Sequence, residues 1–167
     1  RAYAACHGAA LGLPSTLKEW TDSHALRALL VHGHDAVGNL LLGNTARHQF
    51  VSAPEPVALP LSNKAATYAH MAVAASQGEA PGSSAGGEQP KFCTIVGEGD
   101  AARHVLVKFS PAGDAPTDQR TRDLLVCEHL ALQTLASAGI AAASSRISTG
   151  AGRVFLEVER FDRVGAA

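Results

Sequence analysis

The sequence has no long apolar run and no cluster of basic residues. No stretch approaches the roughly 20 apolar residues that a membrane-spanning helix needs, and the first residues lack the charged head and apolar run of a signal peptide. The 14 lysines and arginines face 15 aspartates and glutamates, which gives a net charge of -1. A strongly basic face is therefore not expected. We expect neither a membrane nor a nucleic acid as a direct partner of this chain.

Cysteine is also scarce. Cys6, Cys93 and Cys127 form an odd set without a close pair, which excludes a disulfide framework and predicts a reducing, cytoplasmic location. Cys127 lies in an apolar helical pattern, so we expect a buried thiol there rather than a nucleophile. The chain starts at Arg1 instead of methionine and stops soon after Arg163, so we expect both ends to continue in a longer protein.

The first half of the sequence predicts a mostly helical domain over residues 1–78. With 167 residues, 46% of them hydrophobic, the chain can bury the core of one domain or of two small ones. Residues 1–16 show no decisive pattern. After them the patterns predict, in order, a helix over 17–33, a turn at 35–38, a short strand over 39–42, an extended connector with three prolines over 53–60 and a helix over 64–77.

The second half predicts an α+β domain over residues 79–167. Two hairpins flank one helix, and hairpins join neighbouring antiparallel strands directly. An antiparallel sheet with one packed helix is the natural arrangement for that order. The expected strands are 91–96, 104–109, 144–148 and 154–161, and the expected helix is 117–139 with Leu124, Cys127, Ala131, Leu132 and Leu135 as its apolar stripe.

Lys108 and Glu128 are the strongest candidates for chemistry. Alternation along strand 104–109 puts Lys108 on the face opposite Val107 and Phe109, where a buried lysine needs compensation. Glu128 is the one acid in the apolar stripe of the helix, so it is placed to pair with that lysine and to orient it toward phosphate oxygens. From spacing alone, a solvated lysine and a solvated glutamate remain the alternative.

A segment of small residues, 78–87, precedes these strands. Its glycines allow close approach of backbone N–H groups to phosphates, but it has neither the Gly-Lys-Ser/Thr ending of P-loop enzymes nor a GxGxxG pattern. Read in isolation, this segment is better interpreted as a linker than as a functional loop.

Taken together, the motifs resemble the HipA family of bacterial serine/threonine kinases. The likeness spans about residues 20–163. The motifs that carry it, in order, are GHDAVG at 33–38, SAGGEQPK at 84–91, VLVKF at 105–109, CEHLA at 127–131, AGI at 138–140 and VERFDR at 158–163.

The resemblance implies roles for the loop. Gly86 and Gly87 would lie over the ATP phosphates, and Gln89 and Lys91 would be the most diagnostic side chains of the segment. Ser84 matches a serine that family members autophosphorylate to switch themselves off. A phosphate there would add about -1.5 to -2 charge to a loop built to hold phosphates, so repulsion could expel the loop.

The resemblance also implies roles for the sheet and its helix. Lys108 would contact the α- and β-phosphates, and Glu128 would be its ion-pair partner. Glu159 and Phe161 would lie at a strand end where the backbone meets the adenine ring. The fold implied is a protein-kinase-like N-lobe preceded by a small helical subdomain.

The cofactors implied are ATP and Mg²⁺, and the partners implied are a protein substrate and, as in many family members, a DNA-binding antitoxin. Residues 81–92 also resemble those of HipA-related proteins that lack an adjacent antitoxin, so the antitoxin stays open. Family resemblance suggests a toxin that acts in growth arrest or persistence. After Phe161 the chain has one acid, Asp162, so the catalytic aspartate and the metal-binding asparagine and aspartate are expected beyond its C-terminus. We therefore expect no measurable kinase turnover from these residues alone.

The alternative function is a non-catalytic regulator that uses the same lobe to bind a nucleotide or a protein, joined to a DNA-binding domain outside this segment. A catalytic aspartate followed by asparagine after residue 167 would favour the kinase. His32 and His34 could suggest a metal site, but a third ligand is not evident nearby, so a polar turn is the preferred interpretation.

Overall fold

The computed structural model describes residues 2–36, 40–53, 57–77 and 89–163. Its contacts divide the chain into two compact units. Arg1–Pro54 with Val73–Glu88 form one, called the helical unit below; Glu55–Ala72 with Gln89–Ala167 form the other, called the sheet unit. Within the described ranges, no helix combines the length and apolarity needed to cross a lipid bilayer.

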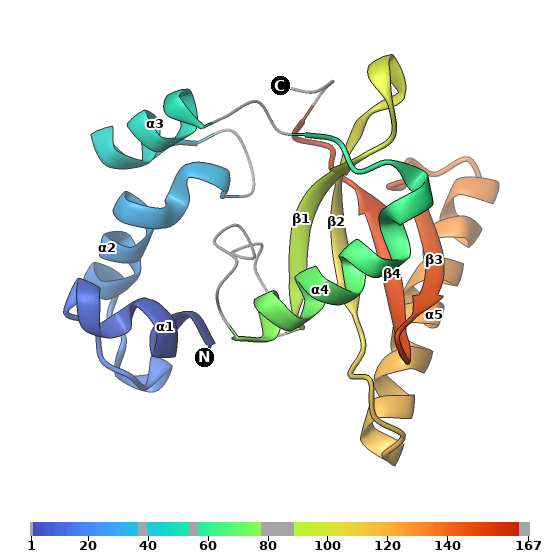
Figure 1. The fold of residues 1–167 in the computed structure, drawn as a ribbon, viewed down its shortest axis with the longest axis horizontal. Helices are drawn as coiled ribbons and strands as arrows, with labels where there is room; N and C mark the ends of the chain where they lie inside the picture. The colour runs from blue at the N-terminus through green and yellow to red at the C-terminus, as the bar shows by residue number, and fades with distance from the viewer. Residues whose placement is uncertain (1, 37–39, 54–56, 78–88, 164–167) are drawn as a thin grey trace. The chain divides into compact units, whose positions relative to one another are not determined.

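The helical unit contains α1 (Ala2–Leu11), α2 (Asp22–His32) and α3 (Gly43–Ser52), with short 3-10 turns at Leu17–Glu19 and Gly33–Asp35 (Figure 1). The helix expected over 17–33 is thus a turn followed by α2. The strand expected over 39–42 is wrong for its described part, because residues 40–42 are irregular and lead directly into α3. A run this short has no stability as a strand without a neighbour to pair with.

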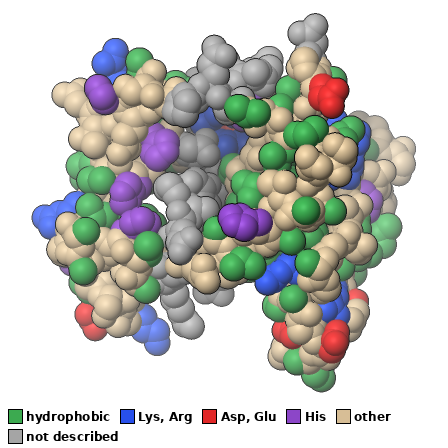
Figure 2. Space-filling view, viewed as in Figure 1, with side chains coloured by type: hydrophobic (Ala, Val, Ile, Leu, Met, Phe, Trp, Pro, Cys, Tyr) green, Lys and Arg blue, Asp and Glu red, His purple; other side chains and the backbone are tan. Residues whose placement is uncertain are grey.

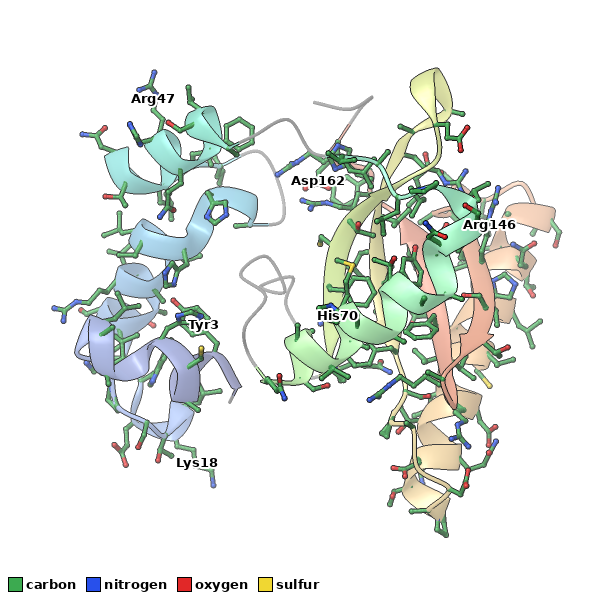
Figure 3. The ribbon with its side chains drawn as sticks, viewed as in Figure 1. Tyr3, Lys18, Arg47, His70, Arg146 and Asp162 are labelled. Carbon is green, nitrogen blue, oxygen red and sulfur yellow. The ribbon has the colours of Figure 1, made fainter. Side chains whose placement is uncertain are left out.

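Aromatic and imidazole rings fill the contact between α1 and α2. The Tyr3 hydroxyl and His32 Nδ1 are 2.7 Å apart, and the His7 and His32 ring centroids are 4.7 Å apart. Trp20 meets Tyr3 edge-on and donates its indole N–H to the carbonyl of Pro14. Figure 2 shows several histidine side chains gathered on this unit, and Figure 3 labels Tyr3 among them. His32 is therefore part of a packed contact at the end of α2, and the turn expected around it is the 3-10 turn Gly33–Asp35.

The sheet unit is built on four antiparallel strands in the order β1-β2-β4-β3. They are β1 (Lys91–Val96), β2 (Arg103–Phe109), β3 (Ser145–Gly150) and β4 (Arg153–Glu159). Helix α5 (Pro116–Ser137) connects β2 to β3. This confirms the expected α+β class and the strand-strand-helix-strand-strand order, with β4 ending two residues before the expected 161.

Two tight turns fix the hairpins. Gly97 follows β1 with φ 114°, and a Cβ at this position would lie 2.6 Å from the carbonyl oxygen of Ala101, so a side chain does not fit. Ala151 and Gly152 join β3 to β4 with φ of 48° and 71°. Positive φ at both positions of a two-residue loop matches the twist of paired strands.

Helices cover both faces of the sheet. Helix α4 (Lys64–Gln77) contributes Tyr68 to one face, where its ring packs against Phe92 and Phe155, and α5 lies on the opposite face (Figure 1). Leu59 of the proline-containing connector forms a parallel bridge with Val96 of the edge strand β1. Residues 57–72 group with the sheet unit by contact.

The buried side of α5 differs from the expected stripe. Leu125 is fully buried, whereas Leu124 is 56% exposed and the Cys127 thiol is exposed. The expectation of a buried Cys127 is therefore wrong. The side that faces the sheet runs through Leu125, Glu128 and His129, which share one face at spacings of three and four. Two of these residues make polar contacts with the sheet, which the pattern of apolar residues does not predict.

Candidate functional site

Lys108 and Glu128 meet between the sheet and α5. Lys108 Nζ lies 2.6 Å from Glu128 Oε1 and 2.9 Å from Oε2, so the ammonium donates to both carboxylate oxygens. The side chains are 23% and 36% exposed, which leaves the pair accessible to a ligand. Charge-assisted contacts of this kind hold a side chain in one orientation.

Lys91 lies beside this pair. It faces Lys108 directly in the β1–β2 register, so both side chains are on the same face of the sheet. Lys91 is 4% exposed. Burial lowers the pKa of Lys91, and the nearby positive charge of Lys108 lowers it further, while Glu128 acts in the opposite direction. Two lysines thus share one face of the sheet beside Glu128.

The loop residues predicted to cover the phosphates are placed in part. Gly86, Gly87 and Ser84 lie outside the described residues. Gln89 is described, half-buried and two residues before Lys91, which begins β1. Pro90 extends the pairing of β1 with β2, because its carbonyl accepts a hydrogen bond from the Phe109 N–H at 3.4 Å.

Glu159 and Phe161 lie at the other end of the same sheet. Glu159 is the last residue of β4 and pairs with Val105, three residues before Lys108 on β2, so the strand end is about 10 Å from Lys108 along the sheet. Phe161 is 87% exposed. An exposed aromatic ring at a strand end is available to pack on a flat apolar ligand.

An arginine-aspartate cluster fixes the chain directly after β4. Arg160 donates from Nε and Nη2 to the two carboxylate oxygens of Asp162 at 3.0 and 2.9 Å, and Arg163 approaches the same carboxylate at 3.1 Å. The backbone N–H of Arg160 also donates to the carbonyl of His104. Figure 3 labels Asp162 within this group. These contacts hold the turn that contains Phe161.

Sequence reasoning missed a buried charged cluster on the α4 face of the sheet. Glu157 is 3% exposed and accepts hydrogen bonds from Lys64 at 2.8 Å, the Tyr68 hydroxyl at 2.8 Å and Arg103 at 3.3 Å. Burial alone would raise the pKa of Glu157, but the bonds from Lys64 and Tyr68 outweigh it and the pKa is lowered. One acid, Glu157, inside the apolar run VFLEV at 154–158 was the available signal.

The described residues do not offer a metal site. No three histidine, cysteine, aspartate or glutamate side chains within these ranges are grouped so that they could hold an ion. The carboxylate of Glu128 is engaged by Lys108. We therefore assign no step to Mg²⁺ in this part of the protein.

The sheet, the helix and the ion pair define a class. A four-stranded antiparallel sheet carries a lysine on one strand, and the following helix supplies the glutamate that pairs with it. This is the arrangement of a protein-kinase-like N-lobe.

Comparison with known proteins identifies the family. Residues 83–166 match the model of the HipA-like C-terminal domain, and residues 1–51 match the YjjJ-like toxin middle domain. Over 166 residues, 99% of this chain, the sequence is 38% identical to Toxin YjjJ of Escherichia coli (strain K12). The chain spans 38% of the length of that relative. No solved structure matches.

The chain belongs to the HipA family, as the sequence motifs predicted.

Proposed function

We propose that this chain is the nucleotide-binding part of a HipA-like serine/threonine protein kinase. In this proposal the full-length protein transfers the γ-phosphoryl group of ATP to a protein substrate. Lys108 contacts the α- and β-phosphates, Glu128 orients its ammonium, and Glu159 and Phe161 receive the adenine ring at the end of β4.

One observation carries the proposal: the two-point contact between Lys108 and Glu128 on an accessible face of the sheet. A partly exposed ion pair has a modest effect on stability. Its position is therefore better explained by a ligand that Lys108 binds. The carboxylate fixes two directions of the ammonium and leaves it able to donate to a phosphate oxygen.

The surroundings of Lys91 favour an anionic ligand at this site. Its pKa is lowered by burial and by Lys108, which means that the charged form is disfavoured in this surrounding. A triphosphate beside the two lysines would reverse that effect by adding negative charge. We propose that Gln89, Gly86 and Gly87 complete the phosphate-binding loop from the segment before β1.

Thermal unfolding of the full-length protein with and without Mg·ATP tests nucleotide binding. We expect saturating nucleotide to raise the melting temperature, since a ligand at 100 times its Kd stabilises by about 2.7 kcal/mol. The shift should disappear in Lys108→Ala and persist in Lys18→Ala, whose lysine is exposed in a turn of the helical unit. Equal shifts in both variants would contradict the role of Lys108.

Transfer of phosphate is a separate test. We expect the full-length protein, but not the 167-residue chain alone, to transfer labelled phosphate to serine or threonine. Nucleotide binding by a full-length protein that transfers no phosphate would favour the non-catalytic regulator instead.

We further propose that Ser84 is the regulatory autophosphorylation site. A phosphate on this residue would add about -1.5 to -2 charge to the proposed phosphate-binding loop. Mass spectrometry after incubation of the full-length protein with ATP should find phosphoserine at position 84. Its absence in an active preparation would refute the assignment.

The role of toxin is proposed from the relative named Toxin YjjJ. We expect expression of the full-length protein to slow bacterial growth, and expect Lys108→Ala to relieve that effect. A DNA-binding antitoxin is the partner proposed for this role. Growth arrest that survives the Lys108→Ala substitution would separate toxicity from nucleotide binding.

A further inference from the structure

Two adjacent residues of α5 reach two different strands. Glu128 contacts Lys108 on β2, and His129 Nδ1 lies 2.9 Å from the hydroxyl oxygen of Ser145 on β3. Strand β4 lies between β2 and β3. The helix is therefore attached on both sides of the strand beneath it.

The buried line of the helix runs between these two contacts. Leu125 is fully buried, and positions 125, 128 and 129 share one face of a helix. Glu128 and His129 point to opposite sides of this line, about 100° apart around the axis. Rotation of α5 about its axis would lengthen one of the two contacts and compress the other.

Small rotations matter at this geometry. Side-chain ends lie about 5–6 Å from a helix axis, so a rotation of about 20° moves them by about 2 Å. Such a shift breaks a contact of 2.6–2.9 Å between Lys108 and Glu128. Ser145 resists it because it is 6% exposed and fixed in the first position of β3.

Other attachments of α5 lie closer to its N-terminus. Arg122 donates to the carbonyl of Gly152 at 2.9 Å, at the turn between β3 and β4. In the described part of the chain, no side chain of α5 after His129 donates or accepts a hydrogen bond with a strand residue. His129 is thus the last polar attachment of the helix to the sheet, directly beside the residue that pairs with Lys108.

We propose that His129, through Ser145, is a positioning residue that holds α5 at the rotation where Glu128 meets Lys108. This inference rests on the proposed function for its consequence, nucleotide affinity, but its structural part is independent of any ligand. It predicts that the loss of His129 acts on the nucleotide through Glu128.

A double-mutant comparison in the full-length protein tests the consequence. We expect His129→Ala to weaken ATP binding about 3- to 10-fold in the natural background and to have no further effect in Glu128→Gln, because the contact it supports is already lost. His129→Asn should retain most of the affinity, since its amide can still bond to Ser145. Gln133→Ala, an exposed change on the same helix, should have no effect.

A second measurement needs no nucleotide. Lysine acylation by a water-soluble reagent, followed by mass spectrometry, reports how well each amine is held, with exposed Lys18 as the internal reference. We expect Lys108 to react slowly in the natural protein and to react several-fold faster in Glu128→Gln, His129→Ala and Ser145→Ala. Ser145→Ala removes one hydroxyl, so it serves if His129→Ala does not fold.

The two experiments separate the two hypotheses. If the natural protein does not bind ATP but Lys108 is protected in a way that depends on His129, the proposed function fails and the positioning role stands. If His129→Ala weakens ATP binding equally in both backgrounds, or leaves Lys108 acylation unchanged, His129 has no positioning role.

Discussion

The two units pack different kinds of side chain in their interiors. In the sheet unit, Phe92, Phe109 and Phe155 form a continuous ring contact with Tyr68, and all are nearly or fully buried. In the helical unit, the contact between α1 and α2 is made largely of Tyr3 and titratable histidine rings. The sheet unit thus carries its charged site on a buried aromatic core, whereas the α1–α2 contact of the helical unit includes His32, whose pKa is lowered by burial and by neighbouring histidines.

The largest difference between the two units in the free energy of unfolding should appear when a buried aromatic ring is removed. Phe155→Ala deletes a 1% exposed side chain that packs on Tyr68 and Phe109, so we expect a loss of about 3–5 kcal/mol in the sheet unit. Leu29→Ala in the helical unit removes a residue already 36% exposed and should cost about 1 kcal/mol.

Hydrogen exchange measured peptide by peptide, on the full-length protein, assigns each loss to its unit. Faster exchange confined to the sheet unit in Phe155→Ala would support two separate cores. Equal acceleration in both units would contradict that division.

Removal of the buried charge of the sheet unit should have the second-largest effect on the free energy of unfolding. Glu157→Gln removes a charge that accepts bonds from Lys64, Tyr68 and Arg103, and we expect a loss of about 2–3 kcal/mol, limited because Lys64 and Arg103 are partly exposed. The folded pKa of Glu157 lies below its usual 4.5, so its contribution is present above that pH and is lost as pH falls through the folded value.

Denaturant unfolding at pH 7 and at pH 3 measures this contribution. The difference between the natural protein and Glu157→Gln should shrink at the lower pH. If the two proteins differ equally in unfolding free energy at pH 7 and at pH 3, the charge of Glu157 is not the source of its contribution.

The stability of the helical unit should change with pH in a higher pH range than that of the sheet unit. Burial and the nearby His7 and His34 lower the pKa of His32 from 6.5, and His32 Nδ1 lies 2.7 Å from the Tyr3 hydroxyl. Burial raises the pKa of Tyr3, which stays neutral here. Because the unfolded chain binds the proton more readily, stability is present above about pH 6.5 and falls as pH drops toward the folded pKa.

Hydrogen exchange of α1 and α2 between pH 7.5 and 5.5, corrected for the intrinsic effect of pH, follows this loss. We expect increased opening at the lower pH in the natural protein and a weaker dependence in His32→Phe. A pH dependence unchanged by that substitution would rule out His32 as its source.

The smallest effect on stability should come from the site itself. Glu128→Gln breaks an ion pair whose side chains are 23% and 36% exposed, so we expect a change of no more than about 1 kcal/mol in unfolding. The same substitution should weaken ATP binding several-fold, because Lys108 loses its orientation. A large loss of stability together with unchanged ATP affinity would make the pair structural.

Sequence patterns predicted the sheet unit better than the helical unit. Strands β1 and β2, the helix α5 and both hairpin turns follow from alternation and from glycine chemistry, which are local signals. Strand alternation also placed Lys108 on the face that Glu128 reaches. In the helical unit, α1 and α3 were missed because their alanine, glycine and histidine content gives no clear apolar face.

Long-range contacts explain the rest. Glu157 meets Lys64 across 93 positions and His129 meets Ser145 across 16, and neither pair has a periodic signature in the sequence. The side of α5 that faces the sheet was predicted wrongly because Leu124 and Leu125 are equally apolar, so the sequence does not show that Leu125 is the buried one.

Calorimetric titration of the full-length protein with ATP and with adenosine tests the central claim most directly. If Lys108 holds phosphates, Lys108→Ala should weaken ATP binding by about 10-fold or more while adenosine binds as before. Equal ATP affinity in Lys108→Ala and the natural protein, or a parallel loss for adenosine, would contradict the account of this site.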